Sequence, residues 1–422
     1  MPGLEEARAL DAADPLRTFR DAFVLPLNEQ GAPVLYFCGH SLGLQPLAAR
    51  ARVAEELDAW ARLAVLGHEQ GRRPWVEYHE QLTAGLQQVT GATAREVVAM
   101  NSLTINLHLM LASFYRPEGR RTKILMESGA FSSDRHAVAS HIAWHGLDPA
   151  VELIELGASR DADLIAHEEV ESALMERDGE IALLLWPSVQ YRTGQAFDIA
   201  RLAAAARRHG AVAGFDLAHS IGNLPHRLHD DHIDFAVWCS YKYLNGGPGA
   251  IGGAFIHERH LDREPLPRLA GWWGHDRVTR FQLGREFHPQ DGAAGWQVSN
   301  PSVLAAAPLL ASLELFQQAG MRALREKSVQ LTGFLARLLA ARPDLELLTP
   351  ADPAARGAQL SLRIAGHISR GKRVYAELLE RGAIVDWREP DVIRAAPAPL
   401  YTRFADVHAF AGVLREALEL CP

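Results

Sequence analysis

The chain is poor in cysteine, which restricts the kinds of site it can build. Its 422 residues include three cysteines, Cys38, Cys239 and Cys421, which lie far apart and form no CxxC pair. A disulfide framework needs several cysteines in an oxidising compartment, and a structural zinc site needs closely spaced thiols. We therefore expect reduced thiols, no bound metal and a cytoplasmic protein.

Long apolar runs and an excess of positive charge are also missing. No window approaches the roughly 20 apolar residues that a membrane helix requires. The acidic N-terminus, MPGLEEARALDAADPL, lacks the basic and apolar regions of a secretion signal. Lysine and arginine total 43 against 51 acidic residues, a net charge of −8, whereas nucleic-acid binding requires a basic face. We therefore expect neither a membrane nor a nucleic acid as partner.

Short apolar runs alternate with amphipathic stretches through the first 300 residues. The pattern predicts helices at 47–66, 101–113, 132–146, 163–177 and 198–210. It predicts strands at 123–127, 151–156, 181–186, 211–216, 235–240 and 251–256. Strands that alternate with helices of this length indicate βαβ units and a mostly parallel sheet.

The pattern changes near residue 300. A helix-rich stretch at 302–341 precedes short predicted strands within 345–350, 358–364 and 382–389. We predict an α/β fold with a large domain at 66–300 and a smaller α+β C-terminal lobe at 301–422. Residues 1–65 are expected to pack with the small lobe.

Two charged residues follow neighbouring predicted strands. Asp216 ends the strand AVAGFD, and Lys242 follows the strand that comes next along the chain. Taken singly, Asp216 fits a helix N-cap equally well, and Lys242 fits a solvated charge. Together they suit pyridoxal phosphate (PLP), which needs a lysine amine for its Schiff base and an acid beside its ring nitrogen.

A phosphate site is expected at the start of the helix that follows Met100. Ser102 and Thr104 lie there with free backbone N–H groups, and Ser133 and Tyr241 could add hydroxyl donors. The glycines of GGPGAIGG do not form a P-loop, because the lysine precedes them. We expect them to let the backbone pass close to the cofactor or to a second subunit.

The segment HRLHDDH, residues 226–232, raises the alternative of a zinc site. Its histidines recur every third residue, a spacing that matches no common set of zinc ligands. The sequence therefore favours no metal.

Several longer motifs resemble those of the bacterial kynureninases, which are fold-type I PLP enzymes. They are YFCGHSLGLQP, MNSLTINLHLM, FSSDRHAVAS, GFDLAHSIGN, HDDHIDFAVWCSYKYLNGGPGAIGGAF, GWWGHD and SNP. The resemblance extends from about Tyr36 to Phe404. It implies hydrolytic cleavage of L-kynurenine, and of 3-hydroxykynurenine, to anthranilate or 3-hydroxyanthranilate and L-alanine in tryptophan degradation.

The resemblance also implies a role for each matching position. Lys242 would form the Schiff base and take part in catalysis with Tyr241 and Asp134, and Asp216 would contact the ring nitrogen. Thr104 and Tyr241 would hold the phosphate. The implied cofactor-binding positions are Leu103, Thr104, Phe131, Ser132, Ser133, Asp134, Asp216, His219, Tyr241, Lys242, Trp272 and Asn300.

Four positions would concern the substrate. Arg394 matches an arginine that binds the α-carboxylate, and His68 matches a residue near the aromatic ring of the substrate. Trp272 and Asn300 resemble residues that reach the site from the partner subunit, which implies a homodimer with shared sites. Pro187 departs from the family pattern, since a small hydroxyl residue is usual there.

Other functions remain open at this point. An aminotransferase would share Lys242 and Asp216 with the expected enzyme. A cysteine desulfurase would need a mobile reactive cysteine late in the chain, which neither Cys239 nor Cys421 fits. A non-catalytic binding protein on the same scaffold would be expected to lack Lys242.

Overall fold

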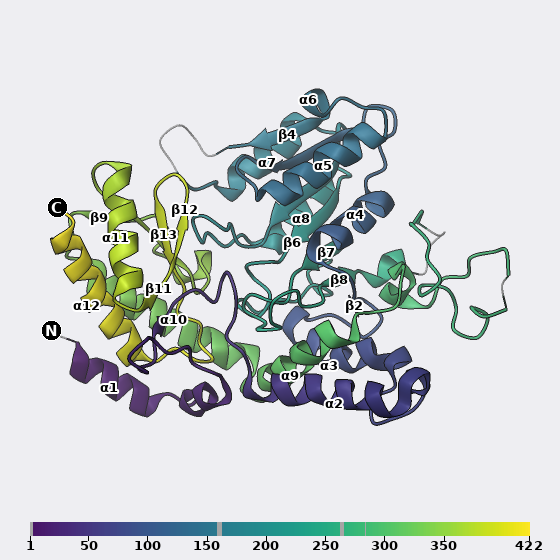
Figure 1. The fold of residues 1–422 in the computed structure, drawn as a ribbon. Coiled ribbons are helices and arrows are strands. Elements are labelled where there is room, and N and C mark those ends of the chain that lie inside the picture. Colours follow the sequence, from purple (N-terminus) through teal and green to yellow (C-terminus); the bar gives the residue numbers. More distant parts are fainter. Residues whose placement is uncertain (1–2, 158–162, 262–265, 283) are drawn as a thin grey trace.

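The computed structural model describes residues 3–157, 163–261, 266–282 and 284–422. It places two lobes side by side, each built on its own sheet (Figure 1). The larger lobe contains a seven-stranded sheet in the order β2-β8-β7-β6-β5-β3-β4. These strands are β2 (Val97–Ala99), β3 (Lys123–Glu127), β4 (Leu153–Leu156), β5 (Ile181–Pro187), β6 (Val212–Asp216), β7 (Phe235–Trp238) and β8 (Gly253–Ile256).

The central strands are parallel, as the sequence predicts. β4, β3, β5, β6 and β7 pair in parallel, whereas β8 pairs antiparallel with both β7 and β2. All six strands predicted before residue 300 form, each within two residues of its expected limits. A parallel sheet places the carboxyl ends of its strands at one edge, where ligands bind in open α/β folds.

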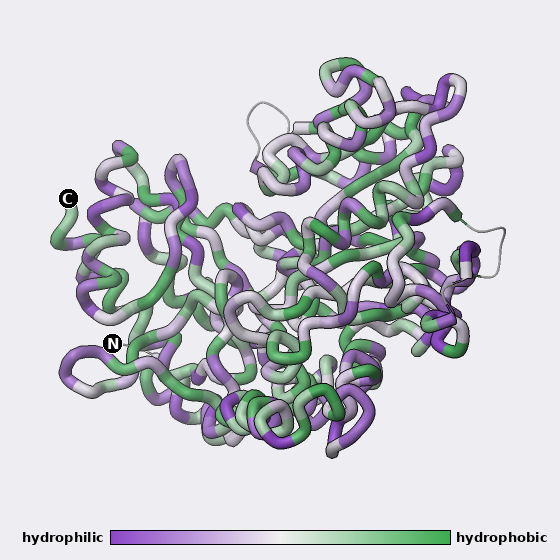
Figure 2. Tube along the Cα trace, turned by 45° about the vertical axis from the view of Figure 1, so that its right-hand side comes forward, coloured by the Kyte–Doolittle hydropathy of each residue, from purple (hydrophilic) through white to green (hydrophobic). Residues whose placement is uncertain are grey.

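Helices cover both faces of this sheet because successive residues of each strand point to opposite sides. On β5, Leu184 and Trp186 join one hydrophobic core, and Leu183 and Leu185 join the other. The covering helices are α3 (Thr83–Thr90), α7 (His167–Glu176), α8 (Ile199–Arg208) and α9 (Val303–Ala319) on the first face, and α4 (Leu103–Phe114) and α5 (Ser132–Trp144) on the second. In Figure 2 the strands of this sheet are mostly hydrophobic, whereas hydrophobic and hydrophilic residues alternate along the outer helices.

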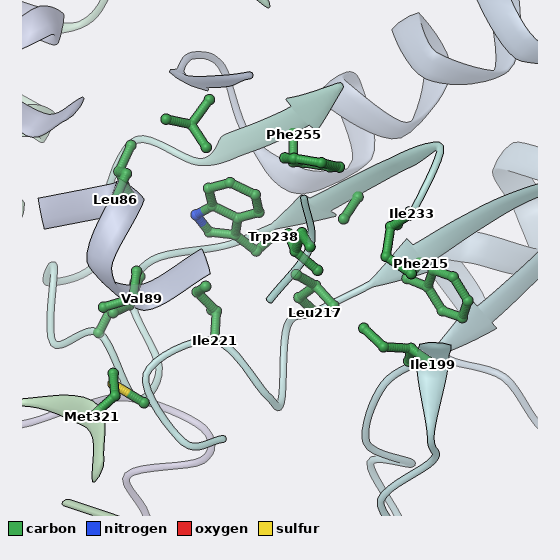
Figure 3. Packing of buried hydrophobic residues seen from close by; sticks show 14 of the residues in the cluster. Leu86, Val89, Ile199, Phe215, Leu217, Ile221, Ile233, Trp238, Phe255 and Met321 are labelled. Carbon is green, nitrogen blue, oxygen red and sulfur yellow. The ribbon is translucent and has the colours of Figure 1, made fainter. Parts of the chain in front are cut away.

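The first core is centred on Trp238, at the end of β7. Its ring lies between Leu86 and Val89 of α3 and Phe255 of β8 (Figure 3). A Cβ atom at Gly253 would lie 2.4 Å from this ring, and one at Gly252 would lie 3.2 Å from Ser102 Cα. These two glycines therefore let β8 pass Trp238 and the start of α4, so the backbone that they approach belongs to this chain.

The smaller lobe contains a four-stranded antiparallel sheet in the order β12-β13-β10-β9. A separate two-stranded parallel sheet joins β1 to β11. The strands of these two sheets are β1 (Leu35–Tyr36), β9 (Leu345–Leu347), β10 (Leu360–Ile364), β11 (Ala383–Ile384), β12 (Asp386–Arg388) and β13 (Val392–Ala395). The helices of this lobe are α10 (Met321–Leu339), α11 (Ile368–Glu380) and α12 (Phe404–Leu420).

The packing changes from one core to the other within α10. Leu324 belongs to the core of the large sheet, as do the buried residues of α9, whereas Leu331 and Phe334 belong to the core of the small lobe. The hydrophobic contacts therefore place α9 with the large lobe, on the far side of the predicted boundary at residue 301. The division into domains stays a prediction.

The N-terminal segment contacts both lobes. α1 (Leu4–Ala13) packs against α12, and β1 pairs with β11, both in the small lobe. α2 (Leu47–Leu63) packs instead along α9. Among the described residues no single helix is long and apolar enough to cross a membrane; α9 and α10 pass that test only as a pair, bent by 83°.

A buried ion pair ties the N-terminal segment to α10. Lys327 Nζ lies 2.8 Å from Asp14 Oδ2, and the two side chains are 6% and 3% exposed. Asp14 Oδ1 also accepts a hydrogen bond from the Leu16 N–H. Burial lowers the pKa of Lys327, while the bond to Asp14 raises it.

We expect Asp14→Asn to destabilise the protein, because it leaves a buried ammonium without its counter-ion. Breaking such a pair costs about 3 kcal/mol or more, which thermal unfolding would register as a lower Tm. Glu6→Gln is the control, since Glu6 of α1 forms an exposed ion pair with Arg337 of α10, the helix that also carries Lys327. Equal Tm values for the two variants would contradict the prediction.

Candidate active site

One cavity at the carboxyl edge of the large sheet collects most of the predicted site residues. Its walls come from the ends of β3, β5 and β6, the first turns of α4 and α5, and the segment after β7. The predicted residues that line it are Leu103, Thr104, Phe131, Ser133, Asp134, Asp216, His219, Tyr241 and Lys242. Ser132 lies beside them at the start of α5 but is exposed.

Lys242 places its amine inside this cavity against an imidazole. Its Nζ lies 3.0 Å from His219 Nε2. Burial, reinforced by the positive charge of Lys242, holds the pKa of His219 well below its ordinary value. His219 is therefore neutral and accepts a hydrogen bond from the lysine.

Three carboxyl groups line the cavity, and two of them, Asp134 and Asp216, influence each other's pKa. Burial raises the pKa of Asp216, while the charge of Lys242 opposes the shift. Burial also raises the pKa of Asp134, well above its ordinary value, and the neighbouring Asp216 adds to the effect. Two adjacent carboxylates cannot both ionise easily in a buried site. We infer that Asp134 carries the proton and that Asp216, the better stabilised by Lys242, carries the charge.

The start of α4 provides a site for an anion. α4 begins at Leu103, so the backbone N–H groups of its first turn lack helical acceptors. Ser133, at the start of α5, places its Oγ 2.6 Å from Thr104 Oγ1 of α4. Backbone and hydroxyl donors at a helix N-terminus suit a phosphate group.

The sequence analysis missed two cavity residues, Glu127 and Tyr191. Glu127 ends β3, is 2% exposed, and its Oε2 has no hydrogen-bond partner among the described residues. The rule that selected Asp216, a carboxylate at the end of a strand, applies equally to Glu127. Tyr191 carries no such signal, since the loop after β5 brings it to the cavity wall, where its ring meets Phe131 edge to face. Pro187 also lines the wall.

Arg394 lies at this wall but is not open to the cavity. It belongs to β13, its side chain is 1% exposed, and its Nη1 donates a 2.6 Å hydrogen bond to the carbonyl oxygen of Tyr191. Its Nε and Nη2 both donate to Asp386. The predicted carboxylate-binding arginine is thus already paired within the chain.

The remaining predicted residues gather elsewhere. His68 and Asn300 line a second cavity with Trp60, Trp75 and Trp273. Trp272 is 47% exposed and packs edge to face on Trp273. Within this chain the structure therefore does not bring His68, Asn300 or Trp272 to Lys242.

The histidines of segment 226–232 do not form one cluster: His229 and His232 both stack on His257, whereas His226 has a different partner. His226 Nε2 lies 3.1 Å from Ser220 Oγ, and His232 Nδ1 lies 3.3 Å from His257 Nε2. His229 instead meets the buried carboxylate of Glu96. Among the described residues, two groups have donor atoms close enough to share an ion: Glu96 with His229 and His257, and Cys38 with His40 and Asp386.

Known proteins resemble this chain over nearly its whole length. The kynureninase of Xanthomonas euvesicatoria pv. vesicatoria is 57% identical over 406 residues, which cover 96% of each chain. That of Xanthomonas axonopodis pv. citri is 56% identical with the same coverage. The chain belongs to the kynureninase family. A model of the kynureninase C-terminal domain also matches residues 324–414.

Solved structures confirm the predicted fold class of this kynureninase-family chain. A variant of the enzyme C-DES, with glycine linked covalently to its PLP cofactor, superposes with a TM-score of 0.75 and 20% identity, covering 90% of this chain and 96% of its own. The cysteine desulfurase CsdA of Escherichia coli gives 0.77 and 20%, covering 96% and 99%. At this identity the likeness shows the fold alone, which is fold-type I.

Glu127 should make the stability of this kynureninase-family protein depend on pH. Burial raises its pKa from 4.5 to about 8, so the folded protein keeps a proton that the unfolded chain releases between those values. The stabilisation is complete below pH 4.5 and is lost as the pH rises to 8, by at most about 1.4 kcal/mol per pH unit.

Glu127→Gln has no proton to release at this position. We therefore expect the Tm of this variant minus the Tm of wild type to be larger at pH 8 than at pH 5. The exposed variant Glu29→Gln is the control. A difference between Glu127→Gln and wild type that is the same at both pH values would contradict the prediction.

Proposed function

We propose that this chain hydrolyses the Cβ–Cγ bond of L-kynurenine, giving anthranilate and L-alanine, with PLP as its cofactor. 3-Hydroxykynurenine would react in the same way, giving 3-hydroxyanthranilate. The observation that carries the proposal is the cavity, where Lys242, Asp216 and the start of α4 lie together. Membership of the kynureninase family supports the same reaction, which belongs to tryptophan degradation.

The residues of the cavity fit PLP group by group. The Lys242 amine matches the aldehyde, the Asp216 carboxylate matches a protonated ring nitrogen, and the first turn of α4 with Thr104 and Tyr241 matches the phosphate. His219 Nδ1 and Asp134 Oδ1 are buried without hydrogen-bond partners among the described residues. Such atoms are costly unless a ligand satisfies them. Phe131 would stack on the ring, and His219 would contact the 3′ oxygen. Leu103, Ser132 and Ser133 would complete the phosphate site.

When bound, PLP supplies an electron sink for the charge that develops at the substrate Cα. Asp216 keeps a proton on the ring nitrogen, because a carboxylate beside a pyridine favours the charged form of the ring. Lys242 takes the Cα proton, and the neutral His219 next to its Nζ can accept a hydrogen bond without competing for charge. Tyr241, which is adjacent to Lys242 and lines the same cavity, provides a hydroxyl that can relay a proton. Water then adds to the γ-carbonyl carbon, and the Cβ–Cγ bond breaks.

Arg394 is the proposed ligand of the substrate α-carboxylate. Its guanidinium reaches the backbone of Tyr191, which lines the cavity. A planar guanidinium binds a carboxylate through two parallel hydrogen bonds. The small lobe thus supplies the group that orients the substrate, while the large lobe supplies the chemistry.

We further propose a homodimer in which the cavity of each chain is completed by its partner. His68 and Asn300 line a cavity of their own, and Trp272 is exposed beside it. Aromatic and amide side chains of this kind suit the ring of kynurenine. The three free thiols and the acidic composition fit a cytoplasmic enzyme.

The alternative of a cysteine desulfurase finds no support in the thiols. Cys239 and Cys421 are buried, and burial raises the pKa of Cys239, which makes it less reactive. Burial also raises the pKa of Cys38 to about 12. An aminotransferase remains the outcome to test against.

Lys242→Ala should abolish both the visible absorbance of the bound cofactor and the release of anthranilate from L-kynurenine. The substitution removes the amine that would bond to the cofactor and the base that would take the Cα proton. Activity is measured by anthranilate fluorescence. A colourless wild type in the presence of PLP would refute the cofactor assignment, and a keto acid without anthranilate would indicate an aminotransferase.

The shared site can be tested by mixing two inactive variants, Lys242→Ala and Asn300→Ala. If Asn300 serves the partner's cavity, each hybrid dimer contains one complete site. Random reassociation should then restore about a quarter of wild-type activity, because half of the dimers are hybrids. Asp134→Ala mixed with Lys242→Ala is the control, since both residues line one cavity and no hybrid site is complete. No recovery with Asn300→Ala would place Asn300 in the site of its own chain.

A further inference from the structure

Arg394 and Asp386 are fixed opposite each other by the register of the small sheet. β12 and β13 are antiparallel, and Asp386 pairs directly with Arg394. Residues opposite each other in an antiparallel pair project from the same face, within side-chain reach. Arg394 Nε donates a 2.7 Å hydrogen bond to Asp386 Oδ1, and Nη2 donates to Oδ2. The two-pronged contact fixes the plane of the guanidinium as well as its position.

The guanidinium retains donors for a second anion. Arginine carries five N–H groups, and its bonds to Asp386 and to the carbonyl oxygen of Tyr191 use three of them. One N–H on each Nη therefore has no acceptor among these contacts. Tyr191 lines the cavity that contains Lys242, so the guanidinium that binds its carbonyl oxygen lies directly behind the wall of that cavity.

The charges around Asp386 leave this region positive. Asp386 Oδ2 also lies 3.1 Å from Arg388 Nη2, and its Oδ1 lies 3.2 Å from His40 Nε2. Burial and the charge of Arg394 lower the pKa of His40 to about 4, so His40 is neutral at pH 7. Although burial opposes it, the neighbouring His40 and Arg394 hold the pKa of Asp386 below its ordinary value. Two guanidinium groups thus face one carboxylate, and the region carries one uncompensated positive charge.

The hydrogen bonds between Asp386 and its two arginines have different effects. Those from Arg394 set the direction of its guanidinium, and the one from Arg388 holds the carboxylate itself. Without Asp386, two guanidinium groups of like charge would face each other in a largely buried region, and Arg394 would turn away.

We propose that Asp386 is a positioning residue that orients the Arg394 guanidinium toward the carboxylate of an amino-acid substrate. The inference rests on the proposed role of Arg394 and adds the residue that orients Arg394 for binding a carboxylate. Asp386 touches no substrate atom. It acts by presenting the two remaining N–H groups of Arg394 together, while Arg388 keeps Asp386 in place.

The test compares two ligands: L-alanine, which carries an α-carboxylate, and the amine that lacks only the carboxylate of L-kynurenine. In the Asp386→Asn holoenzyme we expect L-alanine, followed by its effect on the cofactor absorbance, to bind about tenfold more weakly or worse. The KM for L-kynurenine should rise by a similar factor, with kcat changed far less, because ground-state and transition-state binding are lost together. Binding of the amine that lacks only the carboxylate of kynurenine should not change.

Two further variants separate this inference from the proposed function. Arg394→Gln should also weaken L-alanine binding; if it does not, the carboxylate role of Arg394 fails. If Arg394→Gln weakens binding and Asp386→Asn does not, Asp386 has no positioning role and the inference is wrong. An equal loss of both ligands in Asp386→Asn would likewise overturn it, since that result indicates a general structural defect.

The control is Asp344→Asn, which breaks a matched two-pronged pair with Arg342 in the same lobe, away from the cavity. It should leave binding of both ligands unchanged. If Asp386→Asn does not fold, Asp386→Glu replaces it, because it keeps the charge and shifts the carboxylate by one methylene. Weaker L-alanine binding by folded Asp386→Glu would support the inference, and unchanged binding would overturn it.

Discussion

The positive charge of Lys242, held at the edge of a parallel sheet, is the interaction around which the site is arranged. It opposes the effect of burial on the pKa of Asp216, and it adds to the effect of burial in keeping His219 neutral. Each of these groups would be unfavourable here alone, because burial of a single charge is costly. Together they form a set whose charges and donors match those of one cofactor.

The second lobe approaches this set through the guanidinium of Arg394. Arg394 crosses to the wall of the cavity and binds the backbone of Tyr191, while Asp386 holds it from the opposite side. The two lobes meet again in an ion-pair network, in which Arg192 and Arg363 share Asp163 and Asp391. The relative position of the lobes therefore determines where a substrate carboxylate can bind.

Much of the site could be predicted because the residue at the end of each strand can be read from the local sequence. A carboxylate at the end of one buried strand and a lysine after the next must lie near each other in a parallel sheet, which is how Asp216 and Lys242 were found. The same rule would have found Glu127. Tyr191 lies on a loop, and Asp386 is selected by the register of two strands in another lobe. Neither position carries a local pattern that distinguishes it from a surface residue.

The sequence by itself determined the alternation of strands and helices, the order of the chemical groups along the chain and, through its motifs, the family. Those properties depend on periodicity and on residue type, which are present in the linear chain. Only the tertiary structure decided that Arg394 is already paired, that α9 packs with the large lobe, and that His68, Asn300 and Trp272 lie apart from Lys242. These facts depend on contacts between residues that are distant in sequence. A local sequence pattern does not show which distant side chain will pair with a buried charge or cover an apolar face.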